Sequence, residues 1–290
     1  MGLFDLFKKK QKGELISADI GNDNKIENIS SSNINNSDIE IIEESQGSHG
    51  DNFGGLFGFN YKQTQEGYSL INEMISLSAI QNPISENENA LIKECDFKET
   101  GGNSDQVKVR TVSLNNKVIS GFPYLKTKSS LPFQTKRIIE WAHIKNMEAE
   151  IIGEGRDTFG LAFFATDYAT NKHKYKTNKF LNIKISAFAF VLEKYSFIDP
   201  NTENTVGYFP TKQIPVRTCF DFIGKIISFK ECVISNDNSG YIINIMLINN
   251  ADNPNFFNID IFINKENSRI DKLENGLSVT GVLWFQGEIE

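Results

Sequence analysis

Residues 180–185 of this chain read FLNIKI, and residues 256–261 read FFNIDI. Both stretches begin with an aromatic residue, carry Asn in third place and have Ile in fourth and sixth place. Each follows an apolar run and a loop that contains Asn or Asp, starting from residue 158 in the first case and from residue 241 in the second. Such self-similarity predicts a duplicated strand–loop–strand unit, and therefore two β modules in the C-terminal half.

Alternating apolar and polar residues extend this β pattern over most of the chain beyond residue 105. Residues 107–111 read VKVRT, Asn115 and Asn116 suit a tight turn with positive φ, and the alternation resumes after the turn. This pattern predicts a β-hairpin. We therefore expect a first β module over residues 105–197 and a second over residues 216–290.

The second module resembles the OB-fold in outline. Its first strand is long and carries Gly224 in its interior, two hairpin strands follow, and the closing stretch has a turn glycine at Gly276, an alternating strand that contains Trp284 and a second glycine at Gly287. The resemblance implies a small five-stranded barrel, a fold whose strand faces and loops bind oligonucleotides. The first module is a candidate for a degenerate copy of it. An immunoglobulin-like sandwich, which also has short strands and frequent turns, is the alternative.

The first 58 residues show no pattern that would build a core. They are rich in Asn, Ser, Asp, Glu and Gly and carry isolated Ile residues, so we expect a disordered tether over residues 1–58. At its far end, Leu3, Phe4 and Phe7 precede a run of lysines. This tip is either a short amphipathic anchor for a partner or a membrane surface, or a frayed terminus.

Residues 59–104 are predicted to form a helical segment. Between residues 65 and 82 apolar side chains recur every three or four positions, and Pro83 ends the pattern. Ser85 and Glu88 have the spacing of a capping box, which predicts a second, short helix through residues 90–92. The whole chain is thus expected to be a mainly β protein with a small helical part, of the α+β class.

The composition limits the functions that are open to the chain. The formal net charge is −7, so no global positive field attracts nucleic acid or anionic lipid. The three Cys residues stand far apart, and neither a secretory signal nor a run of about 18 apolar residues is present, which favours reduced thiols and a cytoplasmic location. The high content of Asn, Ile and Lys is typical of an A/T-rich genome and favours a bacterial source.

Sequence motifs that carry chemistry are missing. The chain has three His residues, no zinc-ligand spacing, no nucleophile elbow and no phosphate-binding loop, so we predict neither a metal nor a cofactor. The densest polar cluster contains Asp157 and Asp167, which would form an acid/base pair if they met at one end of a sheet. Carboxylates at strand ends are also ordinary turn residues.

One segment has the composition of a nucleic-acid contact. Its basic and aromatic members are Lys172, Lys174, Lys176, Tyr168 and Tyr175. They predict an exposed loop over residues 172–179 whose lysines contact phosphates while the aromatic rings stack on bases. Just upstream, residues 159–164 read FGLAFF and resemble part of the RNP1 strand of RNA-recognition motifs. A Lys-rich loop is equally consistent with a solvated surface.

These observations favour a non-catalytic protein-interaction or assembly module of a cytoplasmic, bacterial protein. Its partner is expected to be another protein, contacted through the tip, the basic loop or the edges of the β modules. Binding of single-stranded nucleic acid through the OB-like module is the first alternative. An enzyme that uses Asp157 and Asp167 is the second.

Overall fold

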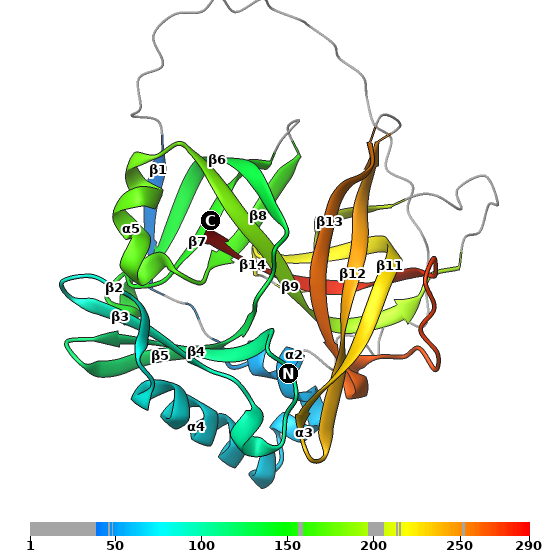
Figure 1. Ribbon diagram of the computed structural model, residues 1–290. Coiled ribbons are helices and arrows are strands. Elements are labelled where there is room, and N and C mark those ends of the chain that lie inside the picture. The colour runs from blue at the N-terminus through cyan, green and yellow to red at the C-terminus, as the bar shows by residue number, and fades with distance from the viewer. Residues whose placement is uncertain are drawn as a thin grey trace, which may run out of the picture.

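The computed structural model of the chain describes residues 39–45, 47, 49–155, 159–196, 206–212, 214, 216–250 and 253–290 (Figure 1). The fold is mainly β with few helices, as the sequence predicts. The tip residues Leu3, Phe4 and Phe7 lie outside the described residues, and so does Asp157.

The strands of the described residues form two sheets. The larger sheet contains β1 (Glu40–Glu44), β6 (Ser130–Trp141), β7 (Ala149–Gly155), β8 (Gly160–Ala165), β9 (Phe180–Lys194), β10 (Gly207–Pro210), β11 (Cys219–Ser235), β12 (Asn238–Asn250), β13 (Asn253–Asn264) and β14 (Ser278–Ile289). The smaller sheet contains β2 (Pro83–Glu86), β3 (Ala90–Cys95), β4 (Val107–Leu114) and β5 (Lys117–Leu125). The helices are α2 (Asn52–Phe57), α3 (Phe59–Lys62), α4 (Gln65–Ile80) and α5 (Tyr168–Thr177), with 3-10 turns at Lys98–Thr100, Ala142–Ile144 and Lys265–Asn267.

Strand pairing closes the larger sheet into two rings that share two strands. The first ring has the order β6-β7-β8-β14-β9, and β9 pairs with β6 to close it. The second ring has the order β9-β13-β12-β11-β14, and β11 pairs with β14 to close it. The shared strands β9 and β14 run antiparallel side by side through the middle of the molecule (Figure 1). Each ring contains one parallel pair, β8 with β14 and β13 with β9.

The two echoed stretches occupy different places in these rings. Residues 180–185 begin β9, which follows α5 as the fourth strand of the first ring in chain order. Residues 256–261 lie in β13, the third of the strands that the second ring adds. The two strands are neighbours in one ring and pair in parallel, with Asp260 opposite Ser186. The echo therefore does not mark matched positions of a duplicated unit.

Local chemistry explains the smaller sheet and the helix that covers it. Thr64 caps α4, since its Oγ1 accepts a hydrogen bond of 3.0 Å from the Gly67 amide. The apolar stripe of α4 packs on β3 and β4, as its spacing predicts. Asn115 and Asn116 have φ of 50° and 63°, so the predicted turn between β4 and β5 is confirmed.

The helix predicted through residues 90–92 is wrong, because this segment is strand β3. The Asn87 side chain accepts hydrogen bonds from the amides of Asn89 and Ala90, at 3.0 and 2.8 Å, and so forms a turn between β2 and β3. This local turn replaces the capping box that the Ser85 and Glu88 spacing indicates. The apolar side chains of β3 then alternate between the two faces of the sheet.

Parts of the expected tether are ordered in the described residues. β1 pairs in parallel with β6, and α2 is buried along its whole length against β5, β9 and β13. The apolar residues of α2, Phe53, Leu56 and Phe57, are covered by strands from elsewhere in the chain, so local composition underestimates their burial. The expected module of residues 105–197 is also divided, because β4 and β5 pair with β3 and not with the rings.

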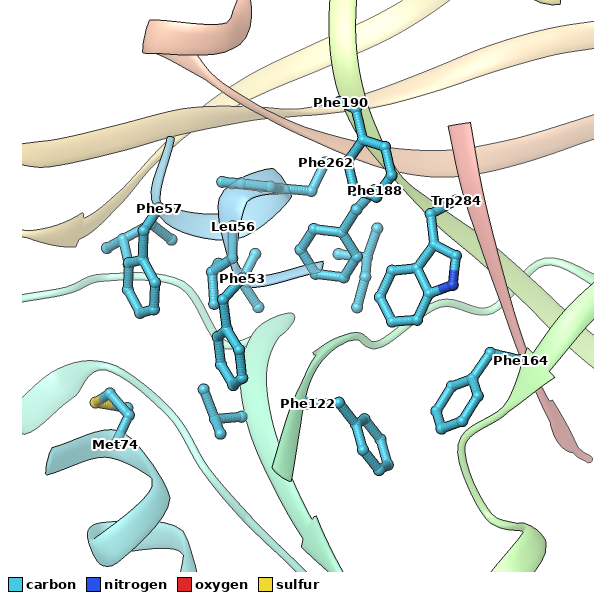
Figure 2. Packing of buried hydrophobic residues seen from close by; sticks show 14 of the residues in the cluster. Phe53, Leu56, Phe57, Met74, Phe122, Phe164, Phe188, Phe190, Phe262 and Trp284 are labelled. Carbon is cyan, nitrogen blue, oxygen red and sulfur yellow. The ribbon is translucent and has the colours of Figure 1, made fainter. Parts of the chain in front are cut away.

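Two buried clusters hold the layers together. One fills the interiors of the rings and includes Ile185, Ile261 and Phe285. The other lies outside the rings, between their strands, α2, α4 and the smaller sheet, and Figure 2 shows its aromatic centre around Phe122, Phe164 and Trp284. We call them the inner core and the outer layer.

Candidate functional site

A cavity of about 630 Å³ lies in the outer layer at the place where the two rings meet. The first ring contributes Trp141 from the end of β6 and Glu150 from β7, and the shared strand β14 contributes Trp284. The second ring adds Cys219, which pairs with Trp284 across β11 and β14. The rest of its described wall comes from the N-terminal segment, the stretch before β11 and two further positions: Glu44, Ser45, Gly47, Asp51, Asn52, Ile214, Val216, Arg217, Thr218, His143 and Phe190.

Two tryptophans form the apolar part of this wall. Both point out of the rings, because alternate residues of a strand face opposite sides of the sheet. The Phe164 ring lies between them, with centroid distances of 5.5 Å to Trp141 and 5.8 Å to Trp284. Gly47 lies flat on the Trp141 indole, where any side chain would overlap the ring. The exposed ring of His143 stacks on the same indole at 6.1 Å.

The charged part of the wall is a cluster of two carboxylates on one guanidinium. Arg217 donates to both carboxylate oxygens of Glu44, at 2.7 and 3.1 Å, and to Glu150 at 3.3 Å. Glu150 is buried, and this desolvation raises the pKa of its carboxyl group in spite of the opposing charge of Arg217. Burial alone would lower the pKa of Arg217, but its hydrogen bonds and charge interactions with the two glutamates raise it. Glu150 is therefore the less well neutralised carboxylate.

A buried polar chain supports the aromatic wall from behind. Asn52 donates from Nδ2 to His49 Nδ1 at 3.0 Å, and His49 Nε2 donates to Glu148 at 2.8 Å. The His49 ring packs 5.2 Å from Trp141 and 6.1 Å from Trp284. These two hydrogen bonds hold both ring nitrogens and so fix the orientation of the imidazole.

The described residues of the cavity lack the parts of a covalent catalyst. Cys219 is the only thiol in the described wall, and burial raises the pKa of Cys219 far above its usual range, so the thiol stays protonated. The described residues also contain no group of three His, Cys, Asp or Glu side chains that would hold a metal ion.

The predicted basic loop is a helix, α5, so the residues expected to form one exposed surface are separated. Tyr168 and Tyr175 are buried, and their hydroxyls donate to Glu140 and Asp167 at 2.8 and 2.7 Å. Neither ring is available for stacking on a base. The loop prediction was wrong because this segment is helical. A helix places residues seven apart on the same face, and here that face is the buried one and carries both tyrosines.

The lysines of α5 have separate roles. Lys172 and Lys176 form ion pairs with the buried carboxylate of Glu140, at 2.7 and 3.0 Å. Lys174 is exposed to solvent. The FGLAFF stretch is equally closed to a nucleic acid, since Phe163 faces the inner core and Phe164 the outer layer.

Asp167 lies at the start of α5, away from the cavity. It is buried and accepts hydrogen bonds from Tyr175, from Asn171 Nδ2 at 2.8 Å and from the Ile289 amide at 3.1 Å. Burial raises the pKa of Asp167 to about 6. Its described neighbours explain it as a structural cap for the end of β14.

Sequence reasoning missed the residues of the cavity wall. Arg217 stands 67 residues from Glu150 and 173 from Glu44, so no local motif joins them. One signal was present: Glu150 is a charge inside an apolar strand. A buried carboxylate in that position requires a partner from elsewhere in the chain.

Comparisons of the chain with protein-family models, with curated proteins and with solved structures found no match. Within the part of the chain that the structure describes, no helix has the length and apolarity needed to cross a membrane.

Proposed function

We propose that the chain is a non-catalytic binding module that receives a segment of a partner protein in the cavity between the two rings. The observation that carries this proposal is the cavity itself. Its volume of about 630 Å³ falls in the range of natural ligand sites, and its wall combines aromatic rings with a few fixed polar groups. The Asn52–His49–Glu148 chain holds that wall in place before a ligand arrives.

The ring architecture supports a binding role as a scaffold. Each ring has five strands. In the first ring α5 lies between β8 and β9, and in the second the 3-10 turn Lys265–Asn267 lies between β13 and β14. This arrangement is compatible with an OB-like barrel, a scaffold that serves many binding functions. The buried, unpaired thiols of Cys95, Cys219 and Cys232 support placing the protein in the cytoplasm.

Single-stranded nucleic acid is a less suitable ligand for this surface. The outer face of the first ring is occupied by the chain's own residues, since His49 and Phe122 pack on Phe164. The cavity also carries more carboxylates than cations, which repels phosphate. The enzyme alternative is less suitable still, because Asp167 is buried by its own hydrogen-bond partners.

A substitution that fills the cavity tests the proposal. Val216 lines the cavity and is 38% exposed, so Val216→Trp should narrow the opening without disturbing the rings. Ile227→Trp is the matched control, because Ile227 is also 38% exposed, lies on β11 and does not line the cavity.

The full chain and both variants would be used as bait for proteins from the native cell, with nuclease treatment in parallel. The affinity of an identified and purified partner would then be measured by calorimetry. We expect Val216→Trp to weaken binding at least tenfold and Ile227→Trp to leave it unchanged. Equal binding by both variants, or a partner that nuclease removes, would contradict the proposal.

A further inference from the structure

We propose that the group seated in the cavity is the cationic head of a Lys or Arg side chain, presented by an extended peptide. This inference rests on the proposed function and adds the chemistry of the ligand. Three features of the wall point to it: the charge balance, the aromatic rings and the indole N–H groups that these rings carry.

Among the residues that the structure describes, the charge balance of the wall leaves one carboxylate in excess. Asp51 is matched by Lys62 at 3.2 Å, outside the main cluster. Arg217 is shared by Glu44 and Glu150, so two negative charges face one positive charge. The shorter contacts go to Glu44, and Glu150 is the more deeply buried of the two carboxylates. A second cation would complete the neutralisation of Glu150 inside the protein.

The aromatic rings favour a long apolar stem beside the carboxylates. Trp141 and Trp284 line the cavity together with Glu150, and His143 extends the ring stack to the surface. Gly47 covers one face of the Trp141 indole and Trp284 is only 2% exposed, so the two rings supply an apolar wall and not an open face for the charged head. The apolar stem of a Lys or Arg side chain would lie along the same rings.

The two indole N–H groups explain why the cation would arrive on a peptide. Trp141 is 6% and Trp284 is 2% exposed, and both line the cavity. The indole N–H is a donor only, so it needs an acceptor. The carbonyl groups of a peptide would supply acceptors that a free metal ion or a simple amine lacks.

The pH dependence of binding follows from the surroundings of Glu150. The titratable and charged groups around it are Glu44 from β1, Asp51, His143, Arg217 and Cys219. A ligand cation favours the ionised form of the Glu150 carboxylate, whose pKa burial has raised. Affinity should therefore increase as the pH rises through the range in which Glu150 loses its proton.

Three capped pentapeptides with the sequence Gly-Gly-X-Gly-Gly, in which X is Lys, Arg or Gln, would test the inference with the full chain. Binding would be followed by tryptophan fluorescence, since both Trp residues line the cavity. We expect the Lys and Arg peptides to bind at least tenfold more tightly than the Gln peptide. Added salt should weaken the binding of the Lys and Arg peptides.

Glu150→Gln should remove most of that preference, whereas Glu193→Gln should not, because Glu193 is paired with Arg269 outside the cavity. Should Glu150→Gln fail to fold, Glu44→Gln removes a charge from the same cluster at a more exposed position. Lack of binding by the charged peptides, equal binding of all three, or a preference that survives both Gln variants would overturn the inference. In each of those cases the proposed function would still stand if Val216→Trp weakened binding of a partner protein and Ile227→Trp did not.

Discussion

Inside the two rings isoleucine is the most frequent buried residue, whereas phenylalanine is the most frequent in the outer layer, and both tryptophans of the chain lie there. The difference follows from the shapes that have to be filled. A ring interior is narrow, and β-branched side chains fit its pleated wall. The outer layer joins strands, helices and a second sheet, and flat rings bridge its wider gaps. The cavity opens at one place where that bridging is incomplete.

Adjacent residues of a single strand separate these two environments. Phe285 belongs to the inner core and Trp284 to the outer layer. Phe285→Ala and Trp284→Ala should each lower the free energy of unfolding by about 3–5 kcal/mol, because each removes a large buried side chain. Urea unfolding of both variants measures this loss. We expect Trp284→Ala alone to change ligand binding under folding conditions. An unchanged melting temperature in Trp284→Ala together with lost binding would show that its indole is only a contact residue.

The outer layer also contains a buried charged side chain, Arg110, whereas the inner core consists of apolar and tyrosine side chains. Arg110 donates to Glu94 at 3.0 Å, to Glu288 at 2.7 Å and to Thr166 at 3.1 Å, and so ties the smaller sheet to β14. Arg110→Met should cost about 3 kcal/mol of unfolding free energy, because it leaves two carboxylates without their buried partner. Arg269→Met, at an exposed ion pair, should cost less than about 1 kcal/mol. Similar losses in chemical denaturation of the two variants would refute a structural role for the Arg110 cluster.

The pH dependence of stability distinguishes a third position. The pKa of Asp167 is about 6 in the folded protein and 3.8 in its ordinary state. The folded state therefore binds the proton more tightly, and stability increases as the pH falls through 6. Between pH 7 and pH 5 the wild type should gain about 1 kcal/mol relative to Asp167→Asn. Denaturation curves of both proteins at the two pH values measure the difference. A relative loss on acidification would contradict the burial that we assign to Asp167.

The smallest effect is expected on the exposed face of α5. Lys174→Gln should change stability by less than about 0.5 kcal/mol, because Lys174 is exposed and supports neither core. The triple change of Lys172, Lys174 and Lys176 to Gln should lower the free energy of unfolding by at most about 1 kcal/mol, since it removes both ion pairs of Glu140. Thermal melts and a single-strand binding assay at physiological salt measure both effects. Micromolar binding that the triple change abolishes would restore the nucleic-acid alternative.

The local parts of the fold could be predicted because their causes are local. The alternation in residues 107–111, the turn at Asn115 and Asn116 and the helical spacing of residues 65–82 each specify one element. The strand pairing that closes the rings could not be predicted, since it joins positions such as Phe164 and Gln286 that no short sequence pattern relates. Alternation shows that a strand has two faces, but it does not identify the neighbour on either edge.

The candidate site shows the same division. Composition correctly identified a Lys-rich segment but assigned it to a loop, because the lysines alternate with other residues. The seven-residue spacing of Tyr168 and Tyr175 was the signal of a helix that buries one face. The cluster of Glu44, Glu150 and Arg217 exists only after β1, β7 and the start of β11 have come together. Its prediction would have required the strand pairing first.

The two shared strands make assembly of the molecule a question of timing. β14 completes both rings, and it follows every other strand in chain order. While the chain is being synthesised, β6 to β13 can pair locally, but each ring keeps an open edge until β14 leaves the ribosome. Open edges invite pairing with other chains. A slow codon or a stalled ribosome before Ser278 would therefore prolong the aggregation-prone interval of both rings at once. A destabilising substitution in β14 should lower the yield of folded protein more than it lowers the melting temperature.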